Sequence, residues 1–162
     1  MILIAPYSKK MPNQLSNAKE YPYWERLLKL IDGKIVQIGI KGEKKLASDF
    51  SENLPLKKIE ELVKECEYWI SIDSFLPHLA HHIGKPGVVI WSMSDPEIFG
   101  YKENLNILKD RKYLREKQFE LWNEVAANPD AFLEPEKAID LINQWKTEKS
   151  GKAASDKDKF KV

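Results

Sequence analysis

The segment from Trp69 to Pro96, WISIDSFLPHLAHHIGKPGVVIWSMSDP, places polar side chains at the start of an expected helix. Asp73 and Ser74 follow a β-branched and aromatic run and can cap a helix that contains His78. A helix N-terminus offers unpaired N–H groups and a positive dipole end to an anion. The Ser74 hydroxyl and the His78 imidazole can donate hydrogen bonds to phosphate oxygens. The segment therefore predicts a diphosphate or nucleotide site.

Two strands and one helix must position these side chains. Tyr68–Ile72 has the composition of a strand, Gly84 and Pro86 end the helix, and Val88–Trp91 is a second strand. In an open parallel sheet, ligands bind outside the carboxyl ends of the strands. Ser94 and Asp95 follow the second strand at that end. We expect them near the adenine or sugar part of a ligand.

The rest of the chain repeats this alternation of strands and helices. Parallel strands joined by helical crossovers give a sheet that is covered on both faces. The expected fold class is therefore α/β, with a Rossmann-like parallel sheet. The expected strands are Ile2–Ala5 and Ile35–Ile40, and the expected helices are Tyr23–Ile31, Glu43–Phe50 and Leu56–Cys66.

Toward the C-terminus, the pattern predicts an extended piece at Leu105–Leu108, a charged helix at Lys112–Ala127 and a last helix from Pro135 to Trp145. The sequence after Trp145 loses both periodicity and apolar content. We expect a domain over residues 1–146 and a mobile charged tail over residues 147–162.

Length and charge restrict the function classes. A chain of 162 residues supports one domain with a sizeable core. Its 26 basic and 25 acidic residues balance, which argues against a nucleic-acid partner. One cysteine, Cys66, excludes an internal disulfide framework and fits a reducing compartment. No apolar run approaches the roughly 20 residues of a membrane span. We expect a cytoplasmic protein.

The order and spacing of several motifs resemble the C-terminal, donor-binding half of the heptosyltransferase-like glycosyltransferases, which use ADP-heptose. Asp73–Ser74, His78–Ala80 and Gly84–Pro86 fall at the spacing of that family's D-[ST]-G-x-x-H-x-A motif and the G-K-P that follows it. Lys19–Pro22 resembles the family's K-[RK]-W-P element. Gly42–Glu43 resembles an element with a glutamate after the next strand. The resemblance implies half of a two-domain GT-B glycosyltransferase.

The resemblance also implies roles for single residues. It implies that Lys19 lies near a phosphate, Glu43 near the ribose, and Asp73, Ser74 and His78 near the diphosphate. The side chains suit these roles, because a lysine supplies a point charge and a carboxylate accepts hydrogen bonds from ribose hydroxyls. The expected ligand is a nucleotide diphosphate sugar, with ADP-sugars favoured, and the resemblance assigns no catalytic residue here.

The chain departs from the family pattern in two ways. Phe75 stands where the motif has a glycine, so a ring occupies space through which a phosphate would approach the backbone. The family's N-terminal, acceptor-binding domain has no counterpart in this sequence. We therefore expect a second copy or a partner chain to supply the acceptor site. The alternative is a non-catalytic module that binds or sequesters a nucleotide or a nucleotide sugar, and a nucleotide-sugar hydrolase is more remote, because no general base stands out.

The histidines and the tryptophans are two further groups of candidate site residues. His78 and His82 could offer two imidazoles to zinc beside Asp73, and His81 lies next to them, but no cysteine or further carboxylate at ligand spacing completes such a site. We expect no metal and no cofactor. The tryptophans occupy apolar positions of expected elements and are expected in the core: Trp24, Trp69, Trp91, Trp122 and Trp145.

Overall fold

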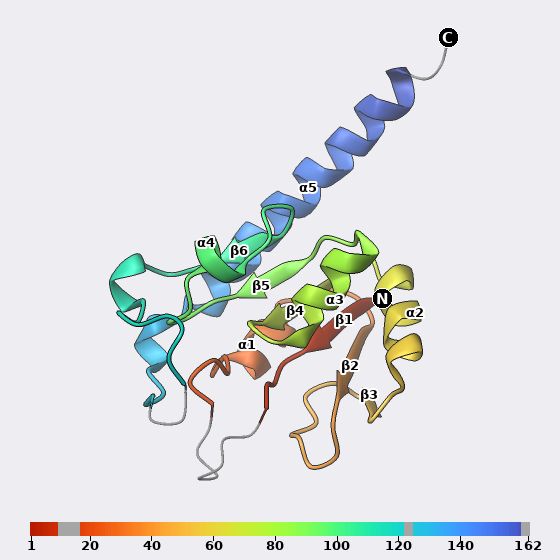
Figure 1. The fold of residues 1–162 in the computed structure, drawn as a ribbon. Coiled ribbons are helices and arrows are strands. Elements are labelled where there is room, and N and C mark those ends of the chain that lie inside the picture. The colour runs from red at the N-terminus through yellow and green to blue at the C-terminus, as the bar shows by residue number, and fades with distance from the viewer. Residues whose placement is uncertain (10–16, 122–124, 160–162) are drawn as a thin grey trace.

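A six-stranded sheet forms the centre of the computed structural model, which describes residues 1–9, 17–121 and 125–159 (Figure 1). Every pair of neighbouring strands is parallel. The spatial order is β3-β2-β1-β4-β5-β6. The strands are β1 (Ile2–Ala5), β2 (Ile35–Gly39), β3 (Asp49–Glu52), β4 (Tyr68–Ile72), β5 (Val88–Ile90) and β6 (Leu105–Ile107).

This order confirms the expected Rossmann-like α/β fold. The chain runs outward from β1 through β2 to β3, then returns to place β4 on the other side of β1. The direction of winding therefore reverses between β1 and β4. In sheets of this kind the crevice at such a reversal is where ligands bind.

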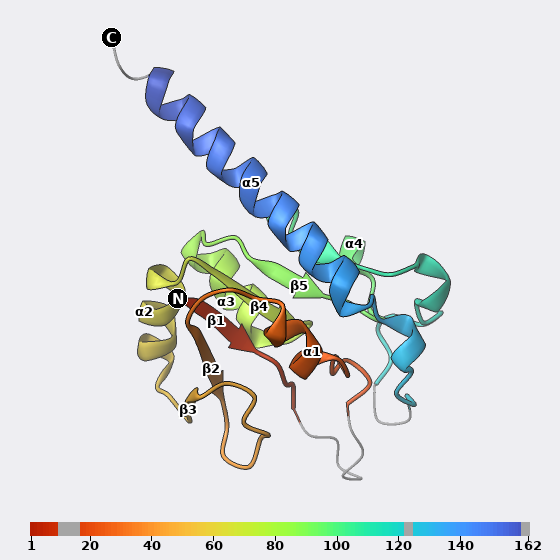
Figure 2. The same cartoon turned by 180° about the vertical axis from the view of Figure 1, so that it is seen from behind.

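Helices cover both faces of the sheet. The helix α5 and the short α1 lie over one face, while α2 and α3 lie over the other, as the two opposite views show (Figures 1 and 2). The α-helices are α1 (Trp24–Lys29), α2 (Leu56–Glu65), α3 (Phe75–Ile83), α4 (Pro96–Phe99) and α5 (Pro135–Lys159). The expected end of α3 is confirmed, because Gly84 adopts a left-handed conformation at φ 77°.

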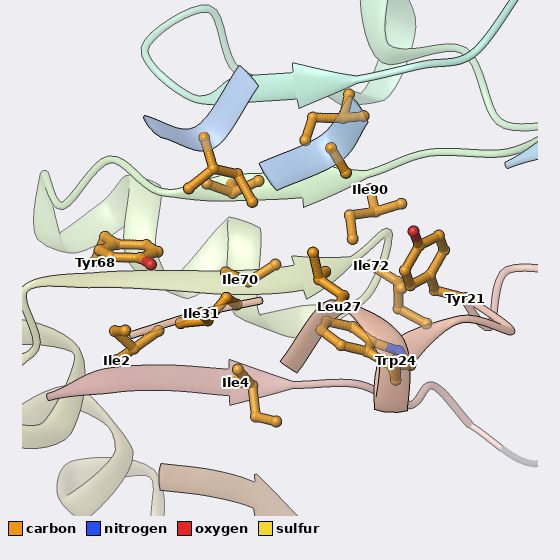
Figure 3. Close-up of a cluster of buried hydrophobic side chains, with 14 of the residues drawn as sticks. Ile2, Ile4, Tyr21, Trp24, Leu27, Ile31, Tyr68, Ile70, Ile72 and Ile90 are labelled. Carbon is orange, nitrogen blue, oxygen red and sulfur yellow. The ribbon is translucent and has the colours of Figure 1, made fainter. Parts of the chain in front are cut away.

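One hydrophobic core lies on each face. The core under α1 and α5 joins isoleucines of β1 and β4 to Leu27 and Trp24 of α1 (Figure 3). The core under α2 and α3 contains Trp69 and Trp91, both almost fully buried. Burial confirms the prediction that Trp24, Trp69 and Trp91 lie in the core. Trp145 is half-buried against Tyr68, and Trp122 lies outside the described residues.

The predicted helix at Glu43–Phe50 is wrong. Residues 44–48 are irregular, and β3 begins at Asp49. The cause is the buried side chain of Gln37 on β2. Its Oε1 accepts hydrogen bonds from the backbone N–H groups of Leu46 (2.7 Å) and Ala47 (3.2 Å), and its Nε2 donates to the Lys44 carbonyl at 3.0 Å. These contacts replace the hydrogen bonds of a helix.

The predicted helix at Lys112–Ala127 is also wrong for the part of the segment that the structure describes. Only Arg111–Tyr113 forms a 3₁₀ turn. The backbone N–H of Arg115 donates to the Met93 carbonyl at 3.0 Å, and Gln118 Nε2 donates to the same carbonyl at 3.0 Å. Contacts with the loop after β5 therefore take the place of helical hydrogen bonds.

The last helix is longer than the sequence pattern predicts. It begins at Pro135 as expected, but α5 continues past Trp145 to Lys159 and projects away from the rest of the chain (Figure 1). Its first turns pack on the sheet through Ala138 and Ile142, which are fully buried. Among the described residues, the structure contains no helix with the length and apolar character of a membrane span.

Candidate functional site

A cavity of about 670 Å³ opens at the carboxyl ends of β1, β2, β3 and β4, beside the first turn of α3. We call it the switch-point cavity, because it lies where the sheet reverses its direction of winding. Five of the predicted site residues line it: Lys19, Glu43, Asp73, Ser74 and Phe75. They come from three separate segments, namely the loop after β1, the turn after β2 and the junction of β4 with α3.

Lys19 and Asp73 form an ion pair in the wall of this cavity. The Lys19 Nζ lies 2.6 Å from Asp73 Oδ2, and both side chains are largely buried. The Ser94 hydroxyl donates to the same carboxylate oxygen at 2.8 Å. The Asp73 charge is thereby compensated. A ligand anion entering beside Lys19 does not meet an unscreened carboxylate.

Ser94 itself is almost fully buried, at 2% exposure, and does not line the cavity. The structure places it behind Asp73, where its hydroxyl orients the carboxylate. Asp95, the other residue predicted after β5, turns away from the cavity. It accepts a hydrogen bond from the Glu97 N–H at the start of α4 and binds both terminal nitrogens of Arg111.

The pairing of Asp95 with Arg111 lowers the pKa of the Asp95 carboxyl. Burial raises the pKa of this carboxyl, but the hydrogen bonds from Arg111 and the Glu97 N–H outweigh burial, and the pKa lies below its ordinary value. Asp95 is therefore a structural carboxylate that joins α4 to the segment after β6. It makes no contribution to the cavity lining.

Ser74 takes the N-cap position of α3, but the predicted capping by its side chain is wrong. Its hydroxyl instead lies 3.1 Å from the Ser71 hydroxyl, at the end of β4. Ser71 also contacts the Ala5 carbonyl of β1 at 3.1 Å. The serine pair therefore joins β1, β4 and α3 at the floor of the site, and Phe75 follows as the first helical residue, with its side chain 47% exposed at the cavity.

Glu43 folds back over the end of β2. Its Oε2 accepts a hydrogen bond from the Ile40 N–H at 3.0 Å. Gly39 makes this possible, since a Cβ on Gly39 would lie 2.0 Å from that oxygen. Gly39 also lines the cavity and was not predicted as a site residue. A glycine at the end of a strand, four residues before a glutamate, is the signal that would have found it.

His78 does not join the other predicted residues. It lies on the next turn of α3, is exposed, and its Nδ1 is 2.8 Å from the Tyr101 hydroxyl. His81 stacks on the same tyrosine at 3.8 Å and pairs with Glu103. No group of His, Cys, Asp or Glu side chains suited to a metal occurs in the described ranges.

Tyr7 is a further cavity residue that sequence reasoning missed, because it lies in a loop without a motif. Burial raises the pKa of Tyr7 to about 12, and the charges of Glu20, Glu43 and Glu25 add to this rise. The phenol is therefore protonated at neutral pH and can donate a hydrogen bond. Ile38, Leu54 and Ile59 complete an apolar wall.

Comparison with known proteins gives matches in solved structures alone. No protein-family model matches the chain, and no curated protein matches its sequence. Heptosyltransferases are among the solved structures that match. E. coli ADP-heptose lps heptosyltransferase II aligns with 93% of this chain and 47% of its own length, at 17% identity and a TM-score of 0.61.

The second match is the dodecameric iron-containing heptosyltransferase TibC, in complex with ADP-D-beta-D-heptose. It aligns with 93% of this chain and 46% of its own length, at 16% identity and a TM-score of 0.64. TibC from enterotoxigenic E. coli H10407 also matches, with a TM-score of 0.53. The chain spans about half the length of the first two. At such low identity the likeness is one of fold, that of a Rossmann-like domain found in GT-B glycosyltransferases.

Proposed function

We propose that this chain is the donor-binding half of a GT-B glycosyltransferase and binds a nucleotide diphosphate sugar, with an ADP-heptose-like donor favoured, in the switch-point cavity. The observation that carries the proposal is the convergence of Lys19, Glu43, Asp73 and Ser74 on one cavity. The motif resemblance names these residues, and the fold independently brings them to the crevice where such sheets bind ligands.

The size and the lining of the cavity suit such a ligand. A volume of about 670 Å³ lies within the roughly 300–1,000 Å³ of sites for small molecules and cofactors. Its lining divides into a polar side with Lys19 and Ser74 and an apolar side with Leu54 and Ile59. A diphosphate would lie on the polar side and a nucleobase on the apolar side. Glu43 lines the same cavity and would accept hydrogen bonds from ribose hydroxyls.

In this proposal Lys19 carries the electrostatic part of the chemistry. A transferred sugar leaves a nucleoside diphosphate behind, and a preorganised positive charge stabilises the negative charge that grows there. Ser94 and Asp73 hold the Lys19 Nζ in place before the ligand arrives. The acceptor and its activating base would come from a second copy or a partner chain.

Calorimetric titration with ADP, UDP and an ADP-sugar, with product analysis of the same mixtures, tests the proposal. We expect the adenine ligands to bind and UDP to bind more weakly. Lys19→Ala should weaken ADP binding about tenfold or more, because it removes a charge-assisted contact to phosphate. Lys34→Ala is the matched control, since Lys34 also pairs with an aspartate, Asp49 at 3.0 Å, outside the cavity lining. Equal ADP affinity of the Lys19 and Lys34 variants would contradict the proposal.

Phe75 favours a second candidate function, a module that binds or sequesters the nucleotide without transfer. Its ring stands at the first position of α3, where the family motif has a glycine that lets phosphate approach the backbone. Product analysis separates the two functions. Binding without any turnover, with every acceptor and candidate partner tested, would favour the non-catalytic module.

A further inference from the structure

A second cavity, of about 560 Å³, lies beside the N-terminal end of α1. We call it the aromatic cavity, after the five rings in its wall: Tyr7, Tyr21, Tyr23, Trp24 and Phe132. It is bounded by the start of α1, by the loop at Lys44 and Leu46, and by residues 127–129. Figure 2 shows α1 on this face of the sheet, which is opposite to α3. Glu20, Tyr21 and Pro22 of the Lys19–Pro22 element line this cavity, but the resemblance assigns a ligand role to Lys19 alone in that element.

The aromatic wall is rigid. The Tyr21 ring makes edge contacts with the rings of Tyr23 (5.6 Å), Trp24 (5.7 Å) and Phe132 (5.6 Å). The polar ends of two rings are held by backbone groups. The Tyr21 hydroxyl donates to the Leu133 carbonyl at 2.8 Å, and the Trp24 indole N–H donates to the Pro6 carbonyl at 3.2 Å. Tyr21, Trp24 and Phe132 are almost fully buried, so the ring surface that is open to the cavity belongs to Tyr7 and Tyr23, which are partly exposed and rest on this rigid layer.

The charged side chains of the aromatic cavity balance. Glu20 and Glu25 supply two negative charges, and Arg26 and Lys44 supply two positive ones. Lys44 pairs with Glu25, and Arg26 pairs with Glu136 at 2.7 Å. Both basic side chains are thus engaged by carboxylates, and the charged groups of the lining can donate or accept hydrogen bonds. The lining suits a neutral ligand that has both an apolar face and many hydrogen-bonding groups.

Tyr7 and Asn17 connect this cavity to the site described above, because both residues line both cavities. A ligand in the aromatic cavity would thus lie next to one in the switch-point cavity, with the Tyr7 ring between them. The phenol is close enough to Glu20 and Glu43, one from each cavity, for both to raise its pKa.

We propose that the aromatic cavity is a binding site for a neutral sugar. Aromatic rings pack against the C–H faces of a sugar ring. Carboxylate oxygens accept hydrogen bonds from its hydroxyl groups, and ammonium and guanidinium groups donate to them. A volume of about 560 Å³ is in the range of small-molecule sites. This inference does not require that the switch-point cavity binds a nucleotide.

Saturation-transfer NMR on the full chain with glucose, mannose, galactose and maltose tests the inference. We expect transfer to at least one of these sugars, with and without ADP present. Tyr23→Ala should weaken its binding about fivefold or more by removing part of the aromatic wall. Glu25→Gln, at an exposed side chain that leaves the core intact, should weaken it about threefold by removing a charged acceptor.

Lys19→Ala is the control, since Lys19 lines the switch-point cavity alone, and sugar binding should be unchanged in it. Absence of transfer to all four neutral sugars would overturn the inference. An affinity for the sugar that is the same in Tyr23→Ala and Glu25→Gln as in the wild type would also overturn it. So would tighter binding of glucose 6-phosphate than of glucose. ADP binding, measured on the same samples, reports on the other cavity and distinguishes a failure of the proposed function from a failure here.

Discussion

At the residue scale, the site is built from side chains that hold one another before any ligand is present. Ser94 is buried and orients Asp73, and Asp73 in turn holds the Lys19 ammonium. Glu43 is held by a backbone N–H over Gly39. Lys19, Glu43 and Asp73 could be predicted as site residues because they match motifs of the family that the sequence resembles. Gly39 could not be predicted in this way, because its role depends on a contact between two segments of the turn.

The carboxylate of Asp95 gives a pH prediction at this scale. Its pKa in the folded chain is lower than its ordinary value of about 3.9. Such a group stabilises the fold above its unfolded pKa, and this contribution is lost as the pH falls through the lower, folded pKa. We expect the wild-type unfolding free energy to decline below about pH 4 by roughly 1 kcal/mol more than that of Asp95→Asn.

Urea unfolding of both proteins between pH 2 and pH 7 measures this difference, with the pH values set by the ordinary range of aspartate titration. Glu97→Gln is the control. Glu97 also contacts Arg111, at 3.0 Å, but its side chain is 75% exposed and its loss should cost less than about 0.5 kcal/mol. Parallel pH profiles for the wild type and Asp95→Asn would show that the pair with Arg111 adds no stability.

At the element scale, five of the six strands follow their sequence pattern, β3 was not predicted, and two expected helices are absent from the described residues. The strand patterns hold because β1 and β4 are buried on both faces and need apolar residues throughout. The two errors share a physical cause. In both segments, contacts with the rest of the fold replace helical hydrogen bonds: the Gln37 side chain of β2 binds backbone groups of residues 44–47, and the Met93 carbonyl accepts from the Arg115 N–H and from Gln118 Nε2. A local pattern carries no information about such partners.

Gln37 also gives a prediction at this scale. Gln37→Leu removes both hydrogen bonds that Oε1 accepts from Leu46 and Ala47 and leaves those N–H groups without that partner. We expect a loss of about 2–4 kcal/mol in unfolding free energy, measured by urea denaturation. ADP binding should weaken as well, because the turn that carries Glu43 precedes this loop. Gln144→Leu, at an exposed position of α5, is the control and should change neither quantity by much.

At the scale of the whole molecule, α5 divides into two parts. Its first turns close the core, with Ile142 fully buried, and its later turns extend beyond the sheet (Figure 2). Lys146 stands at the boundary, where its ammonium lies 3.2 Å from Glu67 and 4.9 Å from the Tyr68 ring centre. The proposed division into a domain over residues 1–146 and a tail over residues 147–162 coincides with this residue.

Truncation after residue 146 tests that division. We expect the shortened chain to unfold with a free energy within about 0.5 kcal/mol of the full chain, because residues 147–151, the removed residues whose burial is described, are all exposed. Thermal and urea unfolding of both chains measure the difference. Truncation after residue 137 is the positive control, since it removes Ala138 and Ile142 from the core. A large loss in the chain that ends at residue 146 would show that the tail belongs to the folding unit.

The central position of β1 in the sheet has a consequence during synthesis on the ribosome. All four residues of β1 are buried, and its two neighbours are β2 and β4. The second neighbour is complete only when Ile72 has been synthesised, which takes roughly 3–13 s at about 5–20 residues per second. Throughout that time the apolar sequence ILIA lacks one of its two partner strands. During synthesis the β1 segment therefore depends on protection from aggregation more than a strand at a sheet edge, which needs a single neighbour.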